Sequence, residues 1–146
     1  MELTYASFGA LEPGIYPMTW EEFKEKFGYN EYRAWLLEGL EWAIADLKKI
    51  GCKAIFVDGS FITKKILPGD FDLCWEEEGV DLVAASKICP GLFDCGRKME
   101  KIKARYRGDV APSESIADIK KDITFLGLFT EDRQGRAKGI IRISIC

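Results

Sequence analysis

The stretch DGSFITKKILPGDFD, residues 58–72, joins two short apolar runs of the chain. It begins with a glycine-serine pair, Gly59 and Ser60, and nine residues separate this serine from Asp70. Asp70 is followed by a phenylalanine and then by Asp72. Because alternate residues of a β-strand point to the same face, the pattern predicts two neighbouring carboxylates with the phenylalanine between them turned into the core.

The composition excludes several kinds of catalytic site. Among the 146 residues there is no histidine, which removes serine–histidine and cysteine–histidine catalysis and every zinc site that uses imidazole. The five cysteines form no Cys-x-x-Cys pair, which favours reduced thiols and a cytoplasmic location. A net charge of -3 gives no general attraction to nucleic acid or to a membrane surface, and no window approaches a membrane-spanning length of apolar residues.

Periodicity and capping residues predict one α+β domain over residues 1–146. Thr19 and Glu22 form a capping box that begins a short helix, and Asn30 caps a longer one that ends at Ile50. The elements expected after it are strands over 54–57 and 71–75, helices over 81–87 and 92–106, a loop over 107–115, and strands over 123–129 and 139–145. We therefore expect N-terminal helices packed on a small mixed sheet, with a C-terminal hairpin.

The paired aspartates and the glycine-serine turn predict complementary binding chemistry. Two adjacent like charges are unfavourable unless a cation balances them, and oxygen-only ligands suit Mg²⁺ (or Mn²⁺). A turn at Gly59 and Ser60 offers backbone amides and a hydroxyl to an anion. Lys64 and Lys65 lie between the two motifs, where they are placed to meet a triphosphate. Taken singly, each motif also has a plainer interpretation, as a surface turn or as a strand that enters solvent.

The combination of an apolar strand, Gly-Ser, nine residues and Asp-x-Asp resembles the signature of the polymerase-β-like nucleotidyltransferase superfamily. The resemblance implies that Gly59 and Ser60 bind the triphosphate of a nucleotide, and that Asp70 and Asp72 are catalytic residues that bind the metal. The whole chain also resembles an uncharacterised family of small bacterial and phage proteins of this type. The shared elements are PGIYPMTWEEF (13–23), VDGSFIT (57–63), PGDFD (68–72) with Cys74-Trp75, and DRQGRAKGI (132–140).

Members of the superfamily usually place a third acid on a neighbouring strand. We expect that strand over 123–129, with the acid near its centre, where this chain has Gly127. Asp122 begins the strand, and Glu131 and Asp132 follow it, so none of these acids lies at its centre and the sequence offers two carboxylates where three are expected. The basic residues of 97–107 are interpreted as a solvated helix face.

Three functions remain open from the sequence. The first is a stand-alone nucleotidyltransferase that moves a nucleoside monophosphate from a nucleoside triphosphate to a hydroxyl on a protein or a small molecule. The second is a catalytically degenerate module that binds a nucleotide or a protein partner, as in toxin–antitoxin pairs or phage systems. The third is a structural or phage-assembly protein without a ligand.

Overall fold

A five-stranded mixed sheet forms the centre of the fold, with strands in the order β1-β7-β2-β3-β4. This computed structural model describes residues 3–94, 99–132 and 134–145. The outer pairs β1–β7 and β3–β4 are parallel, and the inner pairs β7–β2 and β2–β3 are antiparallel. The strand bounds are Ile15–Met18 for β1, Ala54–Asp58 for β2, Asp72–Trp75 for β3, Asp109–Pro112 for β4 and Ile140–Ser144 for β7.

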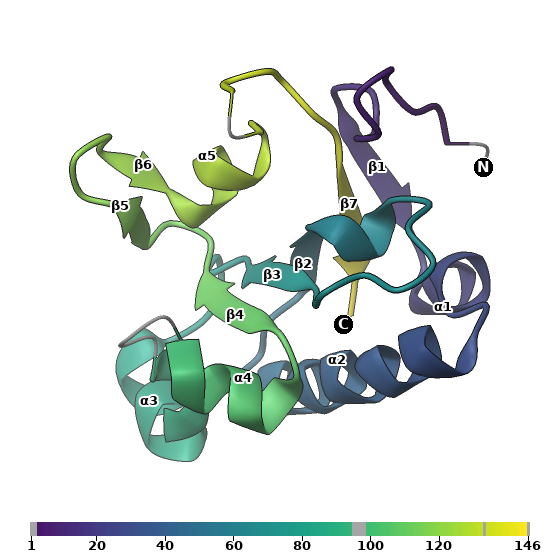
Figure 1. The fold of residues 1–146 in the computed structure, drawn as a ribbon. Helices are drawn as coiled ribbons and strands as arrows, with labels where there is room; N and C mark the ends of the chain where they lie inside the picture. Colours follow the sequence, from purple (N-terminus) through teal and green to yellow (C-terminus); the bar gives the residue numbers. More distant parts are fainter. Residues whose placement is uncertain (1–2, 95–98, 133, 146) are drawn as a thin grey trace.

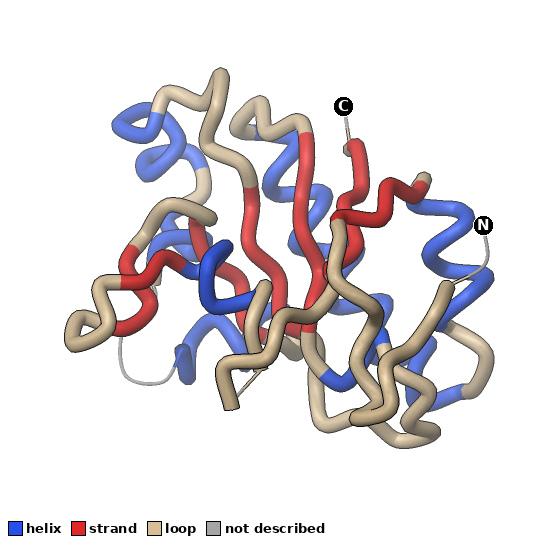
Figure 2. The backbone as a smooth tube through the Cα atoms, turned by 90° about the horizontal axis from the view of Figure 1, so that it is seen from above, coloured by secondary structure: helices blue, strands red, loops and turns tan. Residues whose placement is uncertain are grey.

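Helices and short strands cover the two faces of this sheet unequally. Figure 1 shows α2, α3 and α4 together on one side of the sheet, and α5 with the pair formed by β5 (Ile116–Asp118) and β6 (Ile123–Thr124) on the other. The helices are α1 Trp20–Phe27, α2 Glu31–Lys49, α3 Leu82–Ile88, α4 Glu100–Tyr106 and α5 Phe125–Phe129, with short 3₁₀ helices η1 Ser60–Ile62 and η2 Pro90–Phe93. Seen from above, the sheet strands run side by side (Figure 2).

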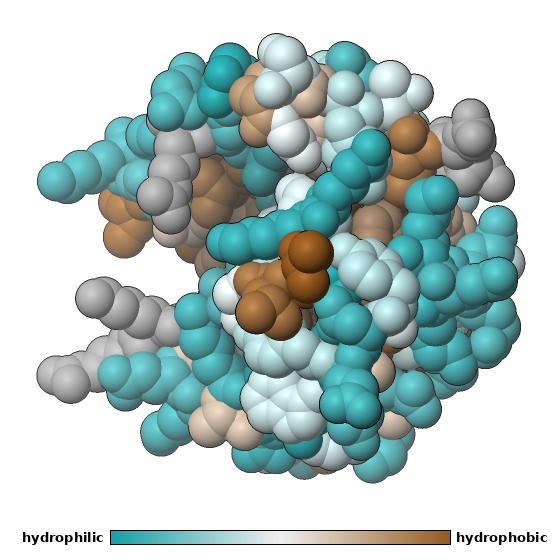
Figure 3. Space-filling model, turned by 45° about the vertical axis from the view of Figure 1, so that its right-hand side comes forward, coloured by the Kyte–Doolittle hydropathy of each residue, from teal (hydrophilic) through white to brown (hydrophobic). Residues whose placement is uncertain are grey.

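The alternation of each strand divides the buried residues between the two faces. Ile55, Val57, Leu73 and Val110 belong to the large core that the main helices complete. The other face carries a small cluster in which Phe56, Cys74 and Ile140 pack against Phe129 of α5. On the surface seen in Figure 3, hydrophobic residues form small separate groups among hydrophilic ones. None of the helices within the described ranges has both the length and the apolar composition that crossing a membrane requires.

The predicted α+β class and the N-terminal helices are confirmed. Thr19 Oγ1 accepts a hydrogen bond from Glu22 N at 3.1 Å, and Glu22 Oε1 accepts one from Thr19 N at 3.0 Å, so the capping box begins α1. Asn30 Oδ1 accepts from Arg33 N at 2.7 Å and caps α2. A C-terminal hairpin is present, and β5 (Ile116–Asp118) and β6 (Ile123–Thr124) form it as an antiparallel pair.

Two predictions for the C-terminal half were wrong. The segment expected as a loop over 107–115 contains β4, because a strand at the edge of a sheet tolerates Pro112, which has no N–H to donate. The strand expected over 123–129 ends at Thr124, whose hydroxyl accepts a hydrogen bond from Gly127 N and caps α5. A short apolar run does not by itself distinguish strand from helix, and here the capping threonine decides. The last strand, β7, pairs with β1 and β2 instead.

A buried arginine of α2 holds the loop that connects β2 to β3. The side chain of Arg33 is fully buried, and its guanidinium donates to the carbonyls of Phe61 (2.6 Å), Thr63 (2.9 Å) and Lys65 (3.2 Å from Nε). It also donates to the carbonyl of Phe27 at 3.0 Å, at the end of α1. The planar fork of donors thus supplies partners to carbonyls that would otherwise be buried without any.

Replacing Arg33 with methionine tests this role. The substitution keeps an unbranched apolar stem but removes the guanidinium and leaves several buried carbonyls without donors, so we expect a loss on the order of 3 kcal/mol in the free energy of unfolding, measured by urea denaturation. Lys48→Met, on an exposed position of the same helix, is the control and should change stability by less than about 0.5 kcal/mol. Equal stability of the two variants would contradict the proposed role of the guanidinium.

Candidate functional site

Three aspartates form a row across adjacent strands. Asp72, the first residue of β3, is paired in register with Asp58 on β2 and with Asp109 on β4. Paired residues point to the same face of a sheet, and this face is the one that α5 partly covers. The register of three strands therefore places three carboxylates side by side at one end of the sheet.

A third carboxylate completes the pair predicted from the sequence. Ligand oxygens of Asp70, Asp72 and Asp109 all lie within 4.8 Å of one another. Asp70 precedes β3, and the structure nevertheless brings it beside Asp72, as predicted. The expected position of a third acid at Gly127 was wrong, because that residue lies in α5 and the strand next to β3 is β4. A cluster of three carboxylates provides the hard oxygen ligands that Mg²⁺ or Mn²⁺ prefers, so the donor set fits such an ion.

Gly59 forms the wall beside Asp72. Its backbone has φ +91°, a region that favours glycine, and a Cβ placed on it would lie 2.8 Å from Asp72 Oδ2. Both the backbone conformation and the close approach therefore require glycine at this position. The glycine-serine turn therefore lies next to Asp72, whereas Ser60 and Asp72 line two different cavities.

Ser60 gives a physical reason for the spacing between the two motifs. Its Oγ accepts a hydrogen bond from the backbone N–H of Gly69 at 3.1 Å. Tyr32 on α2 donates to the carbonyl of the same glycine at 3.1 Å. The loop therefore closes on Ser60 directly before Asp70, and its length determines where that carboxylate lies.

Burial and mutual repulsion raise the pKa values of the carboxyl groups in the row. Burial, and then the charges of Asp109, Asp70 and Asp58, raise the pKa of Asp72 from 3.8 to about 7. Burial also raises the pKa of Asp109, against the opposing effect of Lys103. The pKa of Asp58 is raised by burial in the same way, although Lys138 Nζ lies 2.6 Å from its Oδ2. The row is thus an electrostatically unfavourable arrangement that a divalent cation would relieve.

Two adjoining cavities meet at the ion pair between Asp58 and Lys138. The first, which we call the Ser60 cavity, has a volume of about 430 Å³, and the second, the Asp109 cavity, has about 470 Å³. Both are lined by Asp58, Asp132 and Lys138. The Ser60 cavity is bounded in addition by the glycine-serine turn and by Arg136. The Asp109 cavity combines carboxylates with apolar side chains, namely Leu73, Met99, Ala111, Ile123, Phe125, Leu128 and Phe129.

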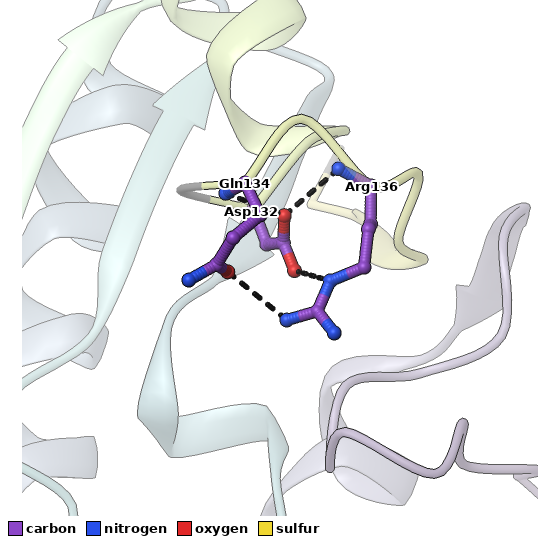
Figure 4. A network of polar contacts seen from close by, with 3 residues as sticks. All are labelled: Asp132, Gln134 and Arg136. Carbon is purple, nitrogen blue, oxygen red and sulfur yellow. Dashed lines mark hydrogen bonds and ion pairs between the residues drawn. The ribbon is translucent and has the colours of Figure 1, made fainter.

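Asp132, Gln134 and Arg136 form a hydrogen-bonded network in the wall of the Ser60 cavity, and Asp132 also lines the Asp109 cavity. Figure 4 shows the Asp132 carboxylate accepting hydrogen bonds from Gln134 N at 2.9 Å, Arg136 N at 2.8 Å and Arg136 Nε at 2.6 Å. The guanidinium also donates to Gln134 Oε1 at 3.0 Å and lies 3.9 Å from the centre of the Phe8 ring. These contacts hold Arg136 in the wall of the Ser60 cavity.

The structure places Lys64 and Lys65 away from the carboxylates. Lys64 Nζ lies 5.1 Å from the centre of the Tyr5 ring, and both belong to the wall of a different cavity. Lys65 is exposed, and its carbonyl accepts from Arg33. Their role in nucleotide binding stays a prediction. The sequence did not single out Asp109 or Lys138, because a Gly-Asp pair in an apparent loop and a lysine after a turn carry no specific signal.

Substituting Asp72 tests the raised pKa. A carboxyl group whose pKa is higher in the folded than in the unfolded protein stabilises the fold at low pH, and this stabilisation is lost as the pH rises through the folded-state pKa, here about 7. Without metal, we therefore expect the thermal midpoint of the wild type to fall relative to that of Asp72→Asn between about pH 4 and pH 7. Glu41→Gln, exposed on α2, should follow the wild type. Parallel pH profiles for wild type and Asp72→Asn would contradict the assignment.

Comparison with known proteins identifies the chain at the level of a family. None of the curated proteins and none of the solved structures matches it. A family model described as "Family of unknown function (DUF6932)" matches residues 3–144, which include the glycine-serine turn, all the aspartates of the row and Lys138. The chain therefore belongs to the family of unknown function DUF6932.

Proposed function

We propose that the protein is a metal-dependent nucleotidyltransferase of the cytoplasm, which transfers a nucleoside monophosphate from a nucleoside triphosphate to a hydroxyl group. The observation that carries the proposal is the cluster of Asp70, Asp72 and Asp109, whose ligand oxygens lie within 4.8 Å of one another beside the turn at Gly59. Three carboxylates next to a glycine-serine turn are the arrangement that the resemblance to polymerase-β-like enzymes implies. The sequence accounts for two of these acids, and β4 contributes the third.

The two cavities suggest how the nucleotide would lie. The triphosphate would pass from the carboxylates towards Ser60, since the Ser60 cavity has Lys138 and Arg136 in its wall. The nucleoside would then occupy the Asp109 cavity, where Phe125 and Phe129 offer apolar contacts to a base. In this placement the phosphate next to the sugar lies at the carboxylate cluster, where the transfer takes place.

The residues of the cluster would divide the chemistry between them. Asp70, Asp72 and Asp109 would hold Mg²⁺ or Mn²⁺, which when bound neutralises charge on the phosphate oxygens and activates the attacking hydroxyl. Asp109 would accept the proton of that hydroxyl. The hydroxyl oxygen would then form a bond to phosphorus as pyrophosphate leaves. Lys138 would neutralise the phosphates near the glycine-serine turn.

The alternative of a catalytically degenerate module loses its main support. It was favoured by the two carboxylates that the sequence offered, and Asp109, paired in register with Asp72, is a third carboxylate beside them. The acceptor stays open between a small molecule and a hydroxyl-bearing side chain of a protein partner, such as the partner of a toxin–antitoxin pair.

Replacing Asp109 with asparagine tests the proposal most directly. With α-labelled ATP, GTP, CTP or UTP, Mn²⁺ or Mg²⁺, and candidate acceptors, we expect transfer by the wild type and a loss of about 100-fold or more in Asp70→Asn, Asp72→Asn and Asp109→Asn. Glu41→Gln should transfer at the wild-type rate. Transfer by Asp109→Asn at the wild-type rate would remove this residue from the site, and absence of label from every acceptor with every nucleotide would contradict the proposed activity.

A comparison of Lys138→Met with Lys64→Met tests which of these two lysines contacts the triphosphate. We expect Lys138→Met to bind a non-hydrolysable triphosphate with Mg²⁺ about tenfold more weakly than the wild type, and Lys64→Met to bind it nearly as well. Isothermal titration calorimetry measures both affinities, and the thermal midpoint checks that Lys138→Met is folded. The reverse order would place the triphosphate at the loop of residues 63–65 instead of the Ser60 cavity.

A further inference from the structure

Lys103 is exposed on α4, yet its ammonium group contacts the carboxylate cluster. Its Nζ atom is 3.3 Å from Asp70 Oδ2 and 3.4 Å from Asp109 Oδ1, so one ammonium bridges two of the three carboxylates. Asp109 Oδ1 is buried and has no hydrogen bond among the described residues, and Lys103 is the cation that faces it. Within the described ranges, Asp72 forms no ion pair, so this carboxylate is left for another cation.

Backbone contacts hold the end of α4, which carries Lys103, next to the cluster. The N–H of Arg107 donates to the carbonyl of Lys103 at 2.8 Å and ends α4 in a left-handed conformation, with φ +68°. Gly108 then passes so close to Phe71 that a Cβ would lie 2.7 Å from its ring and its carbonyl. The N–H of Asp109 donates to the same carbonyl at 3.1 Å. The last turn of α4 and the start of β4 are therefore fixed against the Asp-x-Asp segment.

The charges near the cluster leave room for one divalent cation. Two ammonium groups, those of Lys103 and Lys138, face four carboxylates, which are Asp58, Asp70, Asp72 and Asp109. When all are ionised, two negative charges are left over, and a single divalent ion balances them. A second divalent ion would leave an excess of two positive charges before any phosphate is bound, at a free-energy cost that burial increases, and removing the charge of Lys103 would halve that excess.

We propose that Lys103 takes the place of one of the two metal ions of a two-metal site, so that the protein binds a single divalent cation. Two-metal sites hold their ions about 3.5–4 Å apart, each shared by carboxylates. The ammonium of Lys103 lies between the carboxylates of Asp70 and Asp109, as a metal ion shared by two carboxylates would. Unlike a metal ion, this positive charge is present whatever the metal concentration. The inference rests on the proposed function, because it concerns the metal of that same site.

The test is a titration with Mn²⁺ alone, followed by electron paramagnetic resonance of the free and bound ion. We expect the wild type to bind one Mn²⁺ per chain, and Lys103→Met to bind two with a spectrum broadened by coupling between neighbouring ions. Lys103→Arg keeps the charge and should bind one. The control is Lys101→Met on the same helix, since Lys101 pairs with Asp94 at 3.6 Å instead of with the cluster, and it should also bind one.

Each other result overturns the inference. Two ions in the wild type would show that metal displaces Lys103, and a tighter single site in Lys103→Met would show that the lysine only repels metal. Both outcomes leave the proposed nucleotidyltransferase intact, provided that Asp72→Asn abolishes binding. If the wild type binds no Mn²⁺, or binds it equally after Asp72→Asn, the metal site of the proposed function fails together with the inference.

Discussion

The hydrogen bonds from Arg33 to the loop after β2 are the constraint on which the site depends. The loop of residues 59–71 has no regular structure beyond one 3₁₀ turn, so its buried carbonyls need other donors, and the buried guanidinium supplies them to Phe61, Thr63 and Lys65. Asn30 and Tyr32 of the same helix bind the rest of the loop, at Ile66 and Gly69. One end of α2 therefore determines how the glycine-serine turn and the aspartates approach each other.

The row of carboxylates does not contribute to the stability of the fold. Burial and like charge raise the pKa of Asp72 to about 7, so the arrangement opposes its own ionisation near neutral pH. Strands with apolar residues in this row would be more stable. Unfavourable electrostatics beside two cavities is typical of functional sites, and this is the observation on which the proposed metal and nucleotide binding rests.

Ser60 illustrates how structural and functional interpretations coexist in one residue. Its hydroxyl accepts the N–H of Gly69, so part of the glycine-serine signature serves to close the loop. The same residue lines a cavity together with Lys138 and Arg136. A loss of activity after substitution of Ser60 would therefore not show whether phosphate binding or loop closure was affected. Substitutions of Asp70, Asp72, Asp109 or Lys103 are easier to interpret, because the side chains of these residues do not close the loop.

The sequence alone determined the elements that are specified by caps and turns, which involve only a few neighbouring residues. The capping box at Thr19, the cap at Asn30 and the Gly-Ser and Asp-x-Asp motifs predicted α1, α2 and the core of the site, because caps and turns depend on neighbouring backbone groups. Only the tertiary structure decided that residues 109–112 form an edge strand and that Asp109 and Lys103 join the cluster. Strand pairing brings together residues far apart in the chain, and its register is set by the shared core rather than by any local signal.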